Sequence, residues 1–275
     1  MSRASTTRSS TPSRATSPGT TPPSGRSSPR ATARYRALRR HAAAADFQAL
    51  PPAERRRLAA AARRAVRRLE RLGPAPDRDA HAWTVQHARV IEQTATLLAM
   101  VSENDPDLAE AMRYRDELMA RNTAWWHRHT GHKVLLSAHT GHTAYETYDP
   151  VHYPVTQGAY LRRLLGPDYL SVGTTFGSGA ATVPGDDGGW RTDTFGPPRA
   201  GSSEETLERV GRATGARAFL LDVRTAPPEA RAWLDRTRPT RDIGPPGDPY
   251  RPYALGRGHD VLIHLHRFRA ARPLA

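Results

Sequence analysis

The sequence predicts an α/β fold: a small mixed or mostly parallel sheet flanked by helices, preceded by a disordered N-terminal tail. Apolar residues recur at helical spacing in the first half of the chain, and short β-rich runs alternate with helix-forming runs in the second half. Met1–Arg40 consists mainly of Ser, Thr, Pro and Arg and contains no acidic residue. Because such a segment buries too little apolar surface to offset its ordering entropy, residues 1–40 are expected to be disordered. The remaining residues, 41–275, are expected to form one domain with a helical part at 41–130 and an α/β part at 131–275.

Three consecutive helices are predicted before the first strand. The first begins at Pro51-Pro52, because proline suits a first helical turn, and it ends at Leu72 before Gly73-Pro74. Its apolar positions fall on one stripe, formed by Leu58, Ala62, Val66 and Leu69. A second, more buried helix is expected over Asp79–Val101. A third begins with Asp105 as its N-cap and runs to about Trp126.

Four segments are predicted to be strands. The first is the run KVLLSA, Lys133–Ala138, which is expected to be buried. The other three are Tyr169–Thr175, Arg217–Val223 and Asp260–Leu265. Helices are expected between them at Gln157–Leu165, from Ser203 to about Val210, and at Pro227–Leu234. Asp186–Thr194 is expected to form a glycine-rich loop or hairpin, and the proline- and glycine-rich stretch 236–258 an excursion from the sheet.

Two histidines, His139 and His142, come directly after the first predicted strand. Open α/β folds place their chemistry just past strand ends, and imidazole suits proton transfer near neutral pH. A loop at a strand end could bring two imidazoles that are three residues apart into one cleft. The His-x-x-His spacing is weak evidence on its own, because the chain has twelve histidines and either residue could have a structural role.

The third predicted helix carries three further candidate residues, Arg115, Asp116 and Asn122. Arg115 and Asn122 are seven residues apart and share one helix face, and Asp116 lies close to it. An arginine could bind an oxyanion or a carboxylate, and a carboxylate could orient a histidine. These side chains are therefore predicted to face a substrate cleft, and a surface ion pair is the alternative interpretation.

A metal site is the competing interpretation of the histidines. Six of them lie within 26 residues: His127, His129, His132, His139, His142 and His152. Imidazole is a common ligand of zinc, copper and nickel, but the spacing matches no HExxH motif and the chain has no cysteine. No metal site is therefore predicted. Gly173–Gly179 lacks the lysine of a phosphate loop, and the absence of a Gly-x-Ser-x-Gly motif argues against a serine hydrolase of the α/β-hydrolase type.

The formal net charge of +14 suggests nucleic-acid binding as another hypothesis. However, nine of the 41 basic residues lie in residues 1–40, and every base except Lys133 is an arginine. The rest of the chain has a net charge of only +5, so no specific nucleic-acid partner is predicted. No apolar run approaches the ~20 residues of a membrane helix, so no membrane partner is predicted and a cytoplasmic location is expected. The pattern does not predict an oligomeric state.

Three segments together resemble the erythromycin esterase family: RDELMARNTAWW (Arg115–Trp126), KVLLSAHTGH (133–142) and GPDYLSVGTTFGSG (Gly166–Gly179). The resemblance implies a partial erythromycin esterase-like fold and hydrolysis of a carboxylic ester or lactone, such as a macrolide antibiotic, without a cofactor. It implies that His139 and His142 are catalytic and position water or stabilise charge on the ester carbonyl. Arg115, Asp116 and Asn122 would bind substrate. The family usually has asparagine between the two histidines, where this chain has Thr140.

One part of the family pattern has no equivalent in this sequence. Family members begin with a strand and a Gly-Glu-x-x-His-x-x-x-Glu segment, which supplies the principal general-base histidine. In this chain His41 is the only histidine of the first eighty residues, and it lies among arginines and alanines. We therefore expect a truncated hydrolase with weakened activity. The alternative is a non-catalytic remnant or interaction protein that needs a separately encoded partner half.

Overall fold

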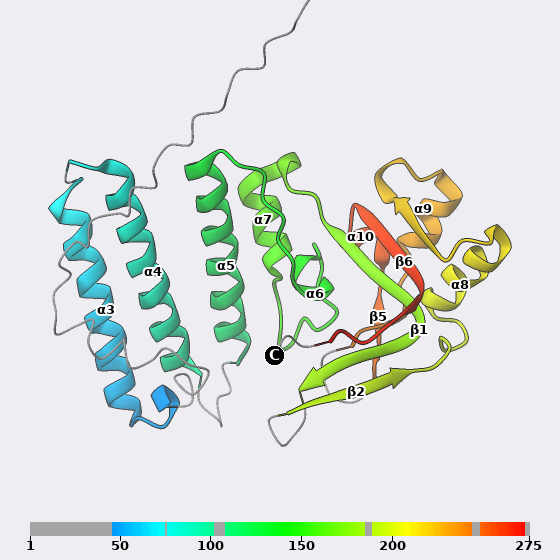
Figure 1. Ribbon diagram of the computed structural model, residues 1–275, viewed down its shortest axis with the longest axis horizontal. Helices are drawn as coiled ribbons and strands as arrows, with labels where there is room; N and C mark the ends of the chain where they lie inside the picture. The colour runs from blue at the N-terminus through cyan, green and yellow to red at the C-terminus, as the bar shows by residue number, and fades with distance from the viewer. Residues whose placement is uncertain (1–45, 75, 102–107, 185–188, 244–247, 273–275) are drawn as a thin grey trace, which may run out of the picture.

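The computed structural model describes residues 46–74, 76–101, 108–184, 189–243 and 248–272. Three long helices lie side by side at one end of the molecule, and a mixed sheet with shorter helices forms the other end (Figure 1). The predicted α/β class, with helices flanking a small sheet, is therefore confirmed. The predicted tail, residues 1–40, and the predicted N-cap at Asp105 lie outside the described residues.

The helical end consists of α3 (Pro52–Leu72), α4 (Arg78–Met100) and α5 (Leu108–Thr130). Small side chains bring α3 and α4 close together: Ala59 and Ala95 pack with Phe47 in a common core cluster. Arg55 of α3 donates to the carbonyl oxygens of Leu98 and Val101, at 3.3 and 2.9 Å. The first helix therefore satisfies carbonyl groups that the C-terminal end of α4 leaves without intrahelical partners.

The main sheet has the strand order β2-β1-β6-β3. Its strands are β1 (Val172–Pro184), β2 (Trp190–Phe195), β3 (Ala218–Asp222) and β6 (Val261–Phe268). The β1–β6 pair is parallel, whereas β1–β2 and β3–β6 are antiparallel. The sheet is thus mixed, and β1 continues through the glycine-rich run into a hairpin with β2. The stretch 236–258 contains two further strands, β4 (Arg238–Arg241) and β5 (Tyr250–Tyr253), which pair only with each other among the described strands.

The shorter helices are α6 (Thr140–Thr143), α7 (Gln157–Leu165), α8 (Ser203–Thr214), α9 (Pro228–Leu234) and α10 (Leu255–Gly258), with 3₁₀ turns η1 (Gly166–Asp168) and η2 (Val223–Thr225). Helix α7 packs on α5, and α8 packs on the sheet at β1 and β6. The Ser202 side chain accepts from the Glu205 N–H to cap α8, which ends at Gly215 in the left-handed conformation. Leu207, Val223, Leu255 and Leu262 form the apolar core between these helices and the sheet.

The predicted first strand, Lys133–Ala138, is wrong in the structure. This segment links α5 to α6 without pairing to any described strand (Figure 1), and its Leu135 side chain is 94% exposed. A β-rich apolar run becomes a strand only where a neighbouring strand accepts its hydrogen bonds. The chain contacts β1 just beyond this segment, where the Thr140 hydroxyl lies 2.9 Å from the Thr174 hydroxyl and accepts the Thr174 backbone N–H at 3.4 Å.

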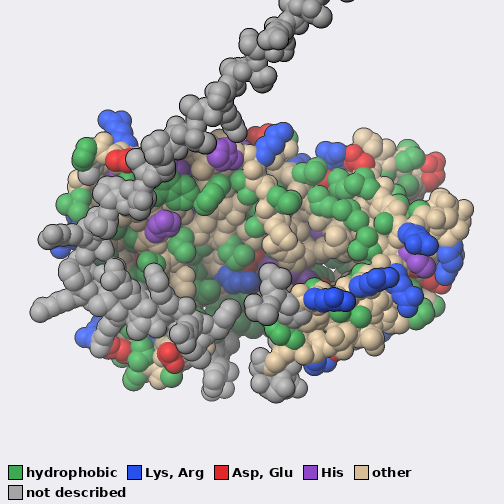
Figure 2. Space-filling model, viewed as in Figure 1, with side chains coloured by type: hydrophobic (Ala, Val, Ile, Leu, Met, Phe, Trp, Pro, Cys, Tyr) green, Lys and Arg blue, Asp and Glu red, His purple; other side chains and the backbone are tan. Residues whose placement is uncertain are grey.

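Charged side chains are dispersed over the surface. In Figure 2, the Lys and Arg side chains form several separate groups among acidic and apolar ones. No helix in the described part of the chain is both long and apolar enough to cross a membrane.

A close backbone contact joins α7 to the segment that carries the two candidate histidines. A Cβ atom at Gly158 would lie 2.2 Å from the Thr143 carbonyl oxygen and 2.3 Å from that of Ala144. We expect Gly158→Ala to lower the free energy of unfolding by about 1–3 kcal/mol or more, because rigid backbone must move to admit the methyl group. Urea denaturation measures the loss. Gly196→Ala is the control, since no atom lies within 4 Å of its Cβ position; equal stability of the two variants would contradict the prediction.

Candidate active site

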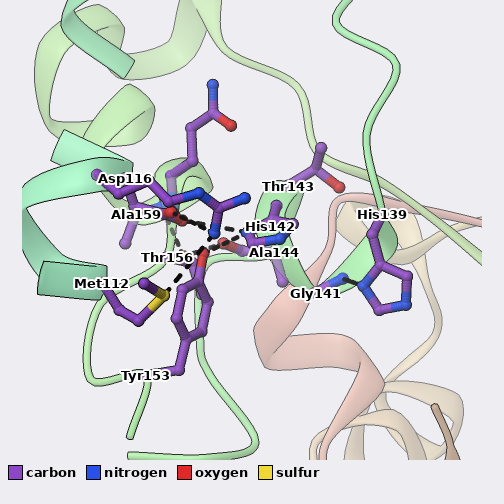
Figure 3. Close-up of polar contacts among 12 residues, drawn as sticks. Met112, Asp116, His139, Gly141, His142, Thr143, Ala144, Tyr153, Thr156 and Ala159 are labelled. Carbon is purple, nitrogen blue, oxygen red and sulfur yellow. Dashed lines mark hydrogen bonds and ion pairs between the residues drawn. The ribbon is translucent and has the colours of Figure 1, made fainter. Parts of the chain in front are cut away.

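The α6 turn fixes the positions of both candidate histidines. His139 is the N-cap residue, and its Nδ1 accepts the backbone N–H of Gly141 at 3.3 Å. His142 lies inside the same short helix. The two ring centroids are 6.2 Å apart and the ring planes are nearly perpendicular, at 76°. In Figure 3 the His139 ring points away from the cluster around His142, so the two imidazoles, although close together, have different hydrogen-bond partners.

His142 faces α5. Its Nδ1 lies 3.3 Å from Oδ2 of Asp116, and the same nitrogen hydrogen-bonds the Tyr153 hydroxyl (Figure 3). Asp116 is fully buried, and its Oδ2 also accepts the backbone N–H of Gln157 at 2.8 Å. One carboxylate therefore contacts the candidate histidine and the first residue of α7, so it holds both in place.

The other two predicted residues of α5 lie on different sides of this cluster. Arg115 Nη1 is 3.6 Å from Asp116 Oδ1, so the arginine accompanies the carboxylate. Asn122 instead exchanges hydrogen bonds of 2.8 Å with Gln86 and Gln93 of α4. It lines a separate cavity of about 710 Å³ between α4 and α5. The structure thus brings Arg115, Asp116 and His142 together. Asn122 lies apart from them, and any contact between Asn122 and a substrate would have to occur in the cavity between α4 and α5.

His139 lines a pocket of about 330 Å³ on the sheet side of α6. Its Nε2 lies 3.1 Å from Oδ1 of Asp242, which follows β4. This hydrogen bond raises the pKa of His139 above its usual value, against the opposing effect of burial. Phe176, Phe268 and Tyr148 supply aromatic walls. Burial, followed by the Asp242 carboxylate, raises the pKa of Tyr148, so its phenol stays protonated at neutral pH.

Sequence patterns did not indicate Asp242 or Tyr153 as site residues. Asp242 is 103 positions from His139, and no local spacing connects two residues so far apart. The only local indication of Asp242 is that it directly follows Arg238–Arg241, a short strand. That strand lies inside the stretch 236–258, which its proline and glycine content predicts to be an irregular excursion from the sheet. Recognising that strand would have placed a carboxylate just past a strand end.

The clustered histidines contact different partners. His127 Nδ1 lies 2.8 Å from the His132 carbonyl oxygen, His129 contacts Asp79 at 2.7 Å, and His152 contacts Asp149 at 3.1 Å. Farther along, Glu208 bridges His264 and His266, at 3.0 and 2.7 Å. Within the described residues, no group of three His, Asp or Glu side chains has the arrangement of a metal site.

Comparisons with known proteins found one matching family model and three solved structures of similar fold. A family model described as erythromycin esterase matches residues 24–268. A solved succinoglycan biosynthesis protein is 24% identical, with a TM-score of 0.70 over 88% of this chain and 58% of its own. A Bacillus cereus protein is also 24% identical, with a TM-score of 0.71 over 88% of this chain and 59% of its own.

An erythromycin esterase mutant, EreC in its open conformation, is 17% identical, with a TM-score of 0.61 over 86% of this chain and 59% of its own. The chain therefore spans just under three fifths of the length of these solved structures. No curated protein matches it.

Proposed function

Because the chain belongs to the erythromycin esterase family, we propose that it hydrolyses a carboxylic ester or a lactone with water activated by histidine. One observation in particular supports this proposal: each candidate histidine is paired with a carboxylate, His139 with Asp242 and His142 with Asp116. A carboxylate beside an imidazole fixes its orientation and stabilises the imidazolium that forms during proton transfer.

His142 is the general base in this proposal. The Asp116 carboxylate can only accept, so it favours the tautomer with the proton on Nδ1 and the lone pair on Nε2. His142 Nε2 takes a proton from water while the water oxygen bonds to the ester carbonyl carbon. The tetrahedral intermediate then breaks its bond to the alcohol oxygen, which takes that proton from the imidazolium.

His139 stabilises charge in this proposal. In its neutral form both ring nitrogens are engaged, with Nδ1 accepting from Gly141 and Nε2 donating to Asp242. Its raised pKa favours the imidazolium, in which Nδ1 donates and no longer accepts from Gly141, and whose positive charge suits an oxyanion developing on the substrate carbonyl. Arg115, beside Asp116, is proposed to bind the substrate from the α5 side, and no cofactor is needed.

A macrolide lactone is the first substrate to test, and its hydrolysis in the cytoplasm would give antibiotic resistance. The second candidate function is a non-catalytic remnant that binds a separately encoded partner half. The exposed apolar side chains of Val134 and Leu135, in an unpaired segment, favour this candidate.

A turnover screen separates the two candidates. The purified protein is assayed at high concentration against simple esters and a macrolactone. Slow turnover supports the hydrolase, whereas no turnover at high protein concentration supports the remnant.

The pairing of Asp116 with His142 gives a sharper test. We expect Asp116→Asn to lower kcat by about 10- to 100-fold, the rate equivalent of losing one hydrogen bond to a charged group. Asp79→Asn is the control, because Asp79 also pairs with a histidine, His129, but is exposed and lines neither of the two described pockets. Steady-state kinetics with circular dichroism on both variants measure the effect. Equal losses in the two variants, or none in Asp116→Asn, would rule out the proposed role.

A further inference from the structure

His259 is a buried imidazole that the proposed reaction does not use. It follows α10, is 2% exposed, and its Nδ1 lies 2.9 Å from the Ser171 hydroxyl oxygen. The same hydroxyl lies 2.7 Å from the carbonyl oxygen of Thr143. A carbonyl oxygen only accepts, so the Ser171 hydrogen must point to Thr143. The hydrogen between Ser171 and His259 therefore sits on Nδ1, and Nε2 carries the lone pair.

That lone pair has no hydrogen-bond partner among the described residues. His259 is also one of the side chains that line the 330 Å³ pocket beside His139. An acceptor buried without a donor is costly, so such a group in a pocket wall calls for a donor from a ligand or a water molecule. Strand β1 leaves room for the ring: a Cβ atom at Gly173 would lie only 2.9 Å from Nε2.

Asp242 supplies a second acceptor in the same pocket. Its Oδ1 pairs with His139, and its buried Oδ2 makes no hydrogen bond of regular geometry with the residues that the structure describes, although the Tyr148 hydroxyl lies near the carboxylate. Arg241 also lines the pocket, but its N–H donors already make hydrogen bonds within the protein. Its Nε and Nη2 donate to the Tyr250 hydroxyl, and its Nη1 donates to the Gly177 carbonyl oxygen at 3.0 Å. Tyr253 donates its hydroxyl hydrogen to the Glu146 carbonyl.

These groups define the chemistry of a ligand. Both groups are acceptors, so the part of a ligand that reaches them has to carry hydrogen-bond donors. An ammonium donor would lie beside the Arg241 and Arg251 guanidiniums, whereas hydroxyl donors satisfy both acceptors without adding a positive charge. Its carbon frame would contact Phe176, Leu265 and Phe268, which form the apolar part of the wall.

We propose that this pocket binds a ligand with hydroxyl groups on an apolar frame, and that His259 Nε2 accepts a hydrogen bond from one of them. Because His139 lines the same pocket, the inference extends the proposed function: the substrate class becomes an ester or lactone that carries free hydroxyl groups. The hydrogen-bonding claim itself concerns binding and does not depend on turnover.

Two ester-free probes test it on the full chain. Phenyl β-D-glucopyranoside carries hydroxyl donors, and 2-phenoxytetrahydropyran has the same frame without them. Affinities are measured by titration calorimetry for the wild type and for His259→Phe, which keeps the ring and removes the acceptor. We expect the wild type to prefer the hydroxylated probe by about tenfold or more, and the variant to lose this preference. His152→Phe is the control, because His152 is an exposed turn residue outside the pocket, and it should keep the preference.

Nitrogen-15 spectra of the wild-type imidazoles show whether His259 Nε2 accepts a hydrogen bond from the ligand, even if His259→Phe does not fold. We expect Nε2 of His259 to be unprotonated in the free protein and its signal to move when the hydroxylated probe is added. A proton on Nε2, equal affinity for both probes, or binding of neither would overturn the proposal and leave water as the partner of these acceptors. Since neither probe contains an ester, a negative result here leaves the hydrolase proposal standing, and absent turnover leaves this one standing.

Discussion

Replacing His139 by alanine is expected to abolish ester hydrolysis, with a fall in kcat/KM of about 10²- to 10⁴-fold, while the circular-dichroism spectrum stays unchanged. His139 is the candidate histidine that lines the 330 Å³ pocket, and its side chain is 36% exposed, so its removal opens no cavity in the core. In the proposed mechanism the loss follows from removing an imidazole whose positively charged form the Asp242 carboxylate favours. Initial rates on a simple ester at several enzyme concentrations measure it.

His152→Ala is the matched control for this prediction. His152 pairs with Asp149 at 3.1 Å, much as His139 pairs with Asp242, but it lies on an exposed turn. Its removal should leave turnover within twofold of the wild type, a change of less than about 0.5 kcal/mol in the activation free energy. Unaltered turnover of His139→Ala would reject the assignment of this residue, and an equal loss in His152→Ala would show that the assay is not specific to the site.

The stability of the fold is expected to fall by roughly 3 kcal/mol as the pH is lowered from about 6.5 to 4, because of His259. Burial lowers the pKa of His259 to about 4 from its usual 6.5, and the neighbouring Asp260 opposes this only in part. Between these two values the unfolded chain binds a proton that the folded protein does not. Stability therefore declines as the pH falls through 6.5 and levels off below 4.

Urea denaturation at half-unit pH steps tests this dependence. In His259→Asn the slope between pH 6.5 and 4 should become smaller, whereas the exposed control His87→Asn should keep the wild-type slope. Part of the slope will remain in the variant, since burial also lowers the pKa of His264. His139 acts in the opposite direction: its raised pKa adds stability at low pH that is lost as the pH rises through the folded value. A variant as pH-dependent as the wild type would contradict the role of His259.

Local patterns predict the helices of this fold well. The helix over Pro52–Leu72 is bounded by prolines and a glycine and has an apolar stripe, and Gln157–Leu165 ends at a Gly-Pro pair, so neighbouring residues carry the information for both. The segment Lys133–Ala138 has the composition of a strand as well. What decides its structure is a hydrogen-bonded neighbour, which composition does not report.

Part of the candidate site can likewise be predicted from local sequence, and part of it cannot. Spacing along the chain brought His139 and His142 to attention, and the helix position of Asp116 suggested a carboxylate that orients a histidine. The directions of the two rings could not be predicted, because the short turn Thr140–Thr143 sets them. Asp242 and His259 come from segments more than 100 residues away, and only tertiary packing brings them to the pocket.

The glutamate that bridges two imidazoles on β6 restricts how this protein can diverge. A Cβ atom at Gly177 would lie 2.1 Å from Oε1 of Glu208, so the carboxylate reaches His264 only because position 177 lacks a side chain. A larger residue there would displace the glutamate and leave a buried imidazole without its acceptor. A substitution at position 177 is therefore expected to be tolerated only if Glu208 and His264 change with it.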